Sequence, residues 1–171
     1  MQKKIRVLLL ITGLVLFKIW IWDVYIVNST ADAALDGAEG EAGVNYVISK
    51  NKELAIRPYE EGFKIYAVSK GFWGWSVTDE MFIEDDGIVE RGLQFIGNEK
   101  VYLSLIVDKE QSLDKVIGYS TNVGTIHFNR TVGDHAILYY YYSDQPMGEV
   151  TYEGTRLNGK TEKLPRDKEL D

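Results

Sequence analysis

The chain has 171 residues, no cysteine and a formal net charge of −7. Residues 1–27 carry +3, so the remaining 144 residues carry −10, enough chain for one domain with a substantial core. A domain this acidic lacks the cationic surface that binds phosphate backbones, so we expect no nucleic acid among its partners. The same charge predicts repulsion from anionic lipid headgroups.

Residues 1–27 predict a signal anchor. Three cations, Lys3, Lys4 and Arg6, surround the start of a 23-residue, mostly apolar run at residues 5–27. A run of about 20 apolar residues can span a bilayer, and cations ahead of it place the N-terminus in the cytoplasm. We therefore predict a single-pass cell-membrane protein with an extracytoplasmic domain.

Two charges interrupt the apolar run. Lys18 can extend its charged end toward the interface, and Asp23 lies near the outer end, where Trp20 and Trp22 suit an aromatic belt. Charges within a membrane segment often meet a partner, so a membrane-protein partner of the helix is one hypothesis.

A cleaved signal peptide is the alternative to an anchor. Its apolar region would be residues 7–17, and Ala31 and Ala33 are the small residues that a signal peptidase reads, so secretion after cleavage near Ala33 stays open. Against cleavage, Ser29 and Asp32 have the spacing of a helix cap that the cut would remove.

Residues 28–43 predict a short helix or linker, and residues 44–159 an extracytoplasmic β-rich domain. Ten short β-type runs are separated by turn residues, and Asn158-Gly159 predicts a type I′ hairpin. The fold class is thus mostly β (α+β), with a single antiparallel sheet domain curled on itself or packed as a sandwich. Residues 160–171 predict a charged, flexible tail. The expected strands are residues 44–49, 53–57, 63–69, 75–83, 88–96, 101–107, 115–120, 123–129, 136–142 and 149–157.

An acidic stretch begins within the expected strand at residues 75–83 and continues into the turn after it. Asp79, Glu84, Asp85 and Asp86, with Glu80, could supply oxygen ligands to a hard cation or the paired carboxylates of a glycan hydrolase. The spacing of a calcium-binding loop is absent, and a solvated turn explains the same acids.

Aromatic residues gather at two places. Trp73 and Trp75, and Tyr140 and Tyr142 within the run of tyrosines at 139–142, could form a ligand-binding platform for sugars or peptides. In a strand, four consecutive tyrosines place two on each face, so at least two should pack inward.

Catalytic chemistry has little support in the sequence. His127, Asp134 and His135 are the only cluster that contains histidine, and they lack the short spacing of a metal-binding pair. There is no nucleophile elbow and no glycine-rich phosphate loop. We expect no cofactor and assign no catalytic residue.

The chain resembles a broad set of small exported or membrane-tethered proteins of Bacillus-like Gram-positive bacteria. The resemblance rests on the anchor, the helix at residues 29–43, the turn from Lys70 to Trp75, and the later Gly148-Glu149-Val150 and Asn158-Gly159-Lys160. It implies location and topology but no activity. Our expectation is a membrane-anchored extracytoplasmic binding domain, accessory to a membrane or envelope process, with a glycan-binding module or a carboxylate-based envelope hydrolase as the alternatives.

Overall fold

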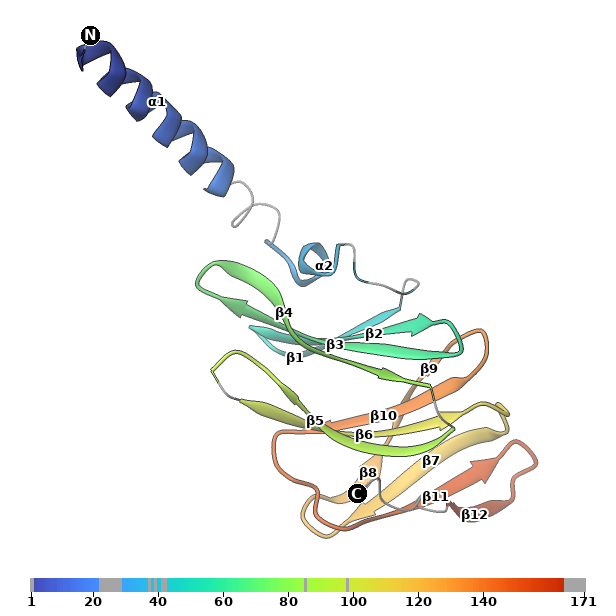
Figure 1. Cartoon of the computed structure of the whole chain (residues 1–171). Coiled ribbons are helices and arrows are strands. Elements are labelled where there is room, and N and C mark those ends of the chain that lie inside the picture. Colours follow the sequence, from blue (N-terminus) through green and yellow to red (C-terminus); the bar gives the residue numbers. More distant parts are fainter. Residues whose placement is uncertain are drawn as a thin grey trace.

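The computed structural model describes residues 2–21, 29–36, 38, 40, 43–84, 86–97 and 99–164. Within them the chain forms two helices and twelve strands, and the strands make three four-stranded antiparallel sheets stacked as layers (Figure 1). The expected mostly β, antiparallel fold is confirmed. The sheets do not close on themselves, so the curled alternative is wrong and the chain forms packed layers.

Each sheet is named here by its position in the stack. The first sheet has the order β1-β2-β3-β4, the middle sheet β5-β6-β10-β9 and the third sheet β12-β11-β7-β8. The first sheet contains β1 (Val44–Ser49), β2 (Lys52–Tyr59), β3 (Gly62–Gly71) and β4 (Gly74–Ile83). The middle sheet contains β5 (Gly87–Gln94), β6 (Lys100–Asp108), β9 (Asn129–Val132) and β10 (Ile137–Ser143). The third sheet contains β7 (Leu113–Ser120), β8 (Gly124–His127), β11 (Val150–Arg156) and β12 (Thr161–Leu164).

The middle sheet is buried on both faces. Leu103, Leu105 and Leu138 pack against the first sheet, and Ile106, Ile137 and Tyr139 pack against the third. Successive side chains of a strand point to opposite faces, so a strand between two layers must be apolar at nearly every position. The apolar runs of β6 and β10 meet this requirement, and burial of these side chains supplies most of the stabilisation of the stack.

The tyrosine run of β10 divides between the two cores. Tyr140 and Tyr142 face the first sheet, whereas Tyr139 and Tyr141 face the third. Tyr139 is buried and its hydroxyl donates to the carbonyl oxygen of Leu113 at 2.6 Å. The expectation that at least two of the tyrosines pack inward is therefore confirmed for Tyr139 and Tyr140.

A short helix, α2 (Ala31–Ala34), covers the outer face of the first sheet. Its N-cap is Thr30, whose hydroxyl oxygen accepts from the Ala33 backbone N–H at 3.1 Å, so the expected cap at Ser29 is wrong by one residue. Within residues 28–43, predicted as a short helix or linker, the described helical residues are Ala31–Ala34.

The β11–β12 hairpin corrects two expectations at the end of the chain. Thr161–Leu164 pair with β11, and Leu164 packs into the core between the middle and third sheets, so these residues are not a flexible tail. The turn has three residues rather than two. Arg156 and Lys160 close it, and Gly159 has a φ of 82°, the arrangement of a type I turn with a glycine bulge. Residues 165–171 lie outside the described residues.

The single strand expected over residues 123–129 is two strands in different sheets. β8 pairs with β7 in the third sheet, and after Phe128 the chain passes to the middle sheet, where β9 pairs with β10. Local β propensity is similar on both sides of this crossing, so the sequence pattern did not reveal it.

The first and middle sheets are joined along their β4 and β5 edges. A bulge at Thr78 turns its hydroxyl toward the Gln94 carbonyl oxygen at 3.0 Å, and the Asp79 carboxylate accepts from the Gln94 backbone N–H at 3.0 Å. Bulges redirect side chains at sheet edges in this way. We call this contact the clamped edge.

The N-terminal helix α1 (Gln2–Ile21) is separated from the layers in sequence by residues 22–28, which lie outside the described residues. Of the expected membrane residues, Lys18 is an exposed residue of α1, the side chain of Trp20 is not described, and Trp22 and Asp23 are not described. No helix among the described residues has the length and apolarity needed to cross a membrane, so the expected transmembrane helix is not supported.

Candidate functional site

An open groove crosses all three sheets at the side opposite the clamped edge. Strands β1, β9 and β8 are the edge strands on this side, and the groove offers about 470 Å³ of space. This volume is in the range of ligand sites in proteins. The lining residues are Tyr46, Val123, His127, Asn129, Tyr141, Tyr142, Ser143, Asp144 and Gln145, and we call the site the tyrosine groove.

Three half-buried tyrosine rings support one another in this groove. The Tyr46 and Tyr142 ring centroids are 5.1 Å apart at 66°, and those of Tyr141 and Tyr142 are 6.4 Å apart at 25°. Tyr140 lies in the core beneath, with its ring centroid 6.1 Å from that of Tyr46. Rings fixed by such contacts offer their remaining faces to a ligand at little cost in side-chain entropy.

The position of Tyr141 and Tyr142 follows from the pairing of β10. Its pairing with β9 ends at Tyr140 and Asn129, whereas its pairing with β6 continues to Ser143. The end of β10 is therefore an edge, and Tyr141 and Tyr142 lie there with part of their surface open to solvent.

Two tyrosines, Tyr142 in the groove and Tyr140 beneath it, have a raised hydroxyl pKa. Burial, then the neighbouring hydroxyl of Tyr46, raises the pKa of Tyr142, and burial raises the pKa of Tyr140 in the same way. A phenol with a raised pKa remains neutral throughout the physiological range, so Tyr142 can both donate and accept hydrogen bonds.

Polar side chains complete the groove. His127 and Asn129 come from β8 and β9, and Asp144 and Gln145 follow β10 in a turn that Ser143 stabilises by donating to the Gln145 carbonyl oxygen at 2.8 Å. The described lining has neither lysine nor arginine. This combination of ring faces, amides, imidazole and carboxylate suits a polar ligand without multiple negative charges.

The structure separates the four aromatic residues proposed as a ligand platform. Only Tyr142 lines the groove, and Tyr140 is in the core below it. Trp75 is buried against α2, whereas Trp73 is exposed at the β3–β4 turn. A sugar platform built from Trp73 and Trp75 needs both indoles exposed on one face. Because Trp75 is buried, these two residues do not form such a platform.

The acidic stretch has structural roles where it is described. Asp79 belongs to the clamped edge, and the Asp86 carboxylate accepts from the Lys109 backbone N–H at 2.9 Å. Glu80 and Glu84 are exposed, and Asp85 lies outside the described residues. No group of three or more potential metal ligands occurs in the part of the chain that the structure describes. None of the described acids in this stretch lines the tyrosine groove, so the hydrolase alternative gains no support.

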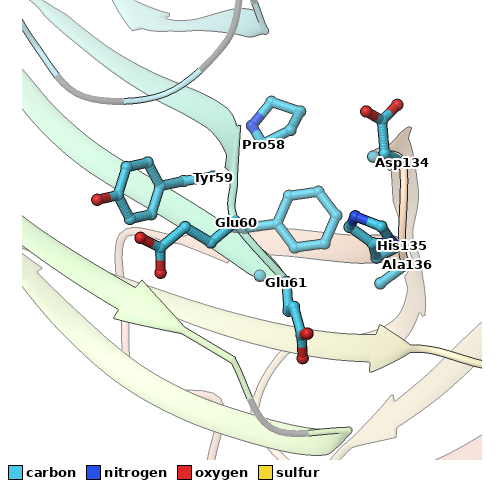
Figure 2. A pocket seen from close by; sticks show the side chains of 10 residues that line it. Pro58, Tyr59, Glu60, Glu61, Asp134, His135 and Ala136 are labelled. Atoms are coloured by element: carbon cyan, nitrogen blue, oxygen red, sulfur yellow. The ribbon is translucent and has the colours of Figure 1, made fainter.

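The two histidines lie in different places. His127 lines the tyrosine groove, whereas Asp134 and His135 line a small cavity of about 50 Å³ beside the turn at Glu60 and Glu61. In that cavity the side chains of Glu60 and Glu61 extend away from His135, and the Asp134 carboxylate points outward (Figure 2). His127 therefore does not share a site with Asp134 and His135.

Sequence reasoning missed most of the groove. Tyr46, Asn129, Asp144 and Gln145 were not singled out, because the residues that line the groove are far apart in the sequence. One signal was present: the tyrosine run exceeds what one core can bury, so some of its rings must reach solvent. Comparisons with protein-family models, with curated proteins and with solved structures gave no match for this chain.

Proposed function

We propose that this protein is a membrane-tethered extracytoplasmic binding domain, and that its tyrosine groove binds an uncharged or weakly charged glycan of the cell envelope. The observation that carries the proposal is the groove itself. Tyr142 contacts both Tyr46 and Tyr141, and polar side chains lie beside these three rings. The lining residues come from all three sheets and enclose a volume of about 470 Å³.

A glycan matches the groove better than the other ligand classes considered. Sugar rings present C–H faces that pack on aromatic rings, and their hydroxyls need donors and acceptors close by. The groove supplies the phenol hydroxyls, His127 and the amides of Asn129 and Gln145. An anionic ligand would instead call for lysine or arginine in the lining.

The surface of α1 supports the tether. Eight large apolar side chains between residues 9 and 19 are each more than half exposed, and the helical period distributes them around the whole circumference. A helix that is apolar on every side needs an apolar environment all round. In the sequence the apolar run continues to Val27, and the cations before it favour a cytoplasmic N-terminus. The eight side chains are those of Leu9, Leu10, Ile11, Leu14, Val15, Leu16, Phe17 and Ile19.

Glycan binding is tested with the full chain in detergent and soluble oligosaccharides of β-1,4-linked N-acetylhexosamines, by isothermal titration calorimetry. Tyr142→Ala should weaken binding at least tenfold, and Asn129→Ala severalfold. Tyr119→Ala is the matched control, because Tyr119 is an exposed tyrosine of β7 outside the groove. Equal affinity in Tyr142→Ala and Tyr119→Ala, or no binding by the unaltered chain, contradicts the proposal.

The tether is tested by extracting cell membranes at alkaline pH and measuring the intact mass of the protein. We expect the chain to stay in the membrane with a mass that begins at Met1. A protein found in the medium, with a mass that begins near Ala34, would establish the cleaved alternative. Photocrosslinking from position 18 then tests the hypothesis that a membrane protein contacts Lys18.

A further inference from the structure

Three turns meet at one end of the first and middle sheets. The Lys70 backbone N–H donates to the Asn51 carbonyl oxygen at 2.9 Å, which joins the β3–β4 and β1–β2 hairpins. The Ile96 backbone N–H donates to the Ser69 hydroxyl oxygen at 3.4 Å, which brings the β5–β6 turn beside them. This end therefore forms one continuous surface.

Large apolar side chains project from this surface. Phe72 is 79% exposed, and its ring packs edge-on against the Trp73 ring with centroids 4.7 Å apart. Trp73 is 52% and Ile96 46% exposed. An exposed aromatic pair at a hairpin turn contributes little to the core, and clustered exposed apolar side chains are typical of surfaces that contact another molecule or a membrane.

Charge is segregated between the two ends of these sheets. Three exposed lysines, Lys50, Lys70 and Lys100, lie in or next to the three turns. Lys52 also lies at this end, where it pairs with Glu99, and Asp144 lines the same hollow as Lys100. At the opposite end the turns carry the exposed acids Glu60, Glu61, Glu84 and Asp86. We call the surface formed by Lys50, Lys70, Phe72, Trp73, Ile96 and Lys100 the basic aromatic end. Although the domain is acidic overall, lysines outnumber acids at this end, so the repulsion from anionic lipid expected from net charge is weakest here.

The chain enters the domain beside the basic aromatic end. α2 packs Ala31 and Leu35 against Val68 and Trp75, close to the β3–β4 turn in the sheet (Figure 1). The eight peptide steps from Ile21 in α1 to Ser29 before α2 span at most about 29 Å. A domain tethered through α1 is therefore held where this end can reach the membrane surface.

We propose that the basic aromatic end docks onto the anionic lipid surface of the membrane that holds α1. Phe72 and Trp73 enter the headgroup region, where aromatic side chains are favoured, and the three lysines face the lipid phosphates. The inference rests on the proposed tether but is independent of the ligand in the groove. Two attachments, the tether and this end, hold the domain in one orientation with its acidic end away from the membrane.

Depth measurements in lipid nanodiscs test the docking. The chain has no cysteine, so Phe72→Cys and Leu157→Cys each give one labelling position for an environment-sensitive fluorophore. Leu157 is 71% exposed in the β11–β12 turn of the third sheet and serves as the matched control. The full chain is reconstituted in phosphatidylcholine with 30% phosphatidylglycerol, with and without brominated lipid.

Brominated lipid should quench the label at position 72 at least threefold more than the label at position 157. Lys50→Glu, Lys70→Glu and Lys100→Glu together should reduce that quenching at least twofold. Equal quenching at the two positions, in a chain that stays in the nanodisc, would overturn the docking and leave the tether intact. A chain that an alkaline wash releases from the nanodisc would overturn the tether, and the docking with it.

Discussion

The two lateral edges of the stack differ in whether their polar groups bond within the protein or face solvent. At the clamped edge, the Thr78 hydroxyl donates to the C=O of Gln94 and the Asp79 carboxylate accepts from its N–H, so these two hydrogen bonds join the first and middle sheets. At the opposite edge, the tyrosine groove leaves ring surface and polar groups open to solvent. One edge contributes stability and the other leaves surface available for binding.

Asp79→Ala tests the clamped edge and should have the largest effect. The carboxylate accepts from the backbone N–H groups of Gln94 and Glu80, and hydrogen bonds to a charged group contribute about 1.5–3 kcal/mol. We expect the free energy of unfolding to fall by about 2 kcal/mol, measured by urea denaturation of the full chain in detergent. The neighbouring exposed Glu80→Ala should change it by less than about 0.5 kcal/mol. Equal losses of unfolding free energy in the two variants would show that the Asp79 carboxylate does not stabilise this edge.

Alkaline pH should act on the tyrosine side of the stack. Burial raises the pKa of Tyr140 and Tyr142 in the folded chain, so the folded state retains protons that the unfolded state has lost. The stability that these two groups contribute is fully present below about pH 10 and is lost as the pH rises from about 10 through the folded pKa. The free energy of unfolding falls by at most about 1.4 kcal/mol per pH unit for each group. Tyr142→Phe should make this loss shallower in urea titrations at pH 9–11. A loss that is unchanged in Tyr142→Phe would contradict the assignment.

Thr30→Ala provides a reference away from both edges. It removes the oxygen that accepts from the Ala33 backbone N–H at the start of α2. Loss of such a cap typically costs about 1 kcal/mol, and for a four-residue helix we expect about 0.5–1 kcal/mol. Thr30→Ser keeps the acceptor and should be close to neutral in the same urea measurement. If the serine variant loses as much as the alanine variant, the hydroxyl is not the cap.

Glu53→Gln should have the smallest effect and the opposite sign. Burial, and then the charge of Asp32, raises the pKa of Glu53, so ionised Glu53 disfavours the folded state above the folded pKa. Its contribution to stability is present below about pH 4.5 and is lost as the pH rises through the folded pKa. The glutamine variant should therefore be slightly more stable than the unaltered chain at pH 7 and show no such gain at pH 3.5. A less stable variant at pH 7 would contradict this explanation.

Local sequence patterns predicted the strands better than their arrangement. β1 runs over the expected residues 44–49, and β3, β4 and β6 lie within two residues of expectation, because alternation and flanking turn residues are local signals. The third layer was not predicted. Its signal was the continuous apolar character of β6, since a strand buried on both faces cannot alternate.

The candidate site was less predictable than the fold for a physical reason. Tyr46, His127 and Tyr142 meet only after three sheets have stacked, and no spacing in the sequence encodes that meeting. Trp75 illustrates the reverse error, because an indole that looked available for binding fills the space under α2. Net charge also gave an incomplete prediction, because the acidic total does not show that several lysines lie at one end of the domain.

Hydrogen–deuterium exchange of the full chain, with and without the N-acetylhexosamine oligosaccharide, compares the two edges most directly. We expect slower exchange in peptides that contain residues 44–49, 123–129 and 140–145 when the glycan is bound. Peptides that contain residues 76–84 and 87–94, from the clamped edge, should be unchanged. Protection confined to the clamped edge, or no change anywhere at saturating glycan, would contradict the assignment of the tyrosine groove as the binding site.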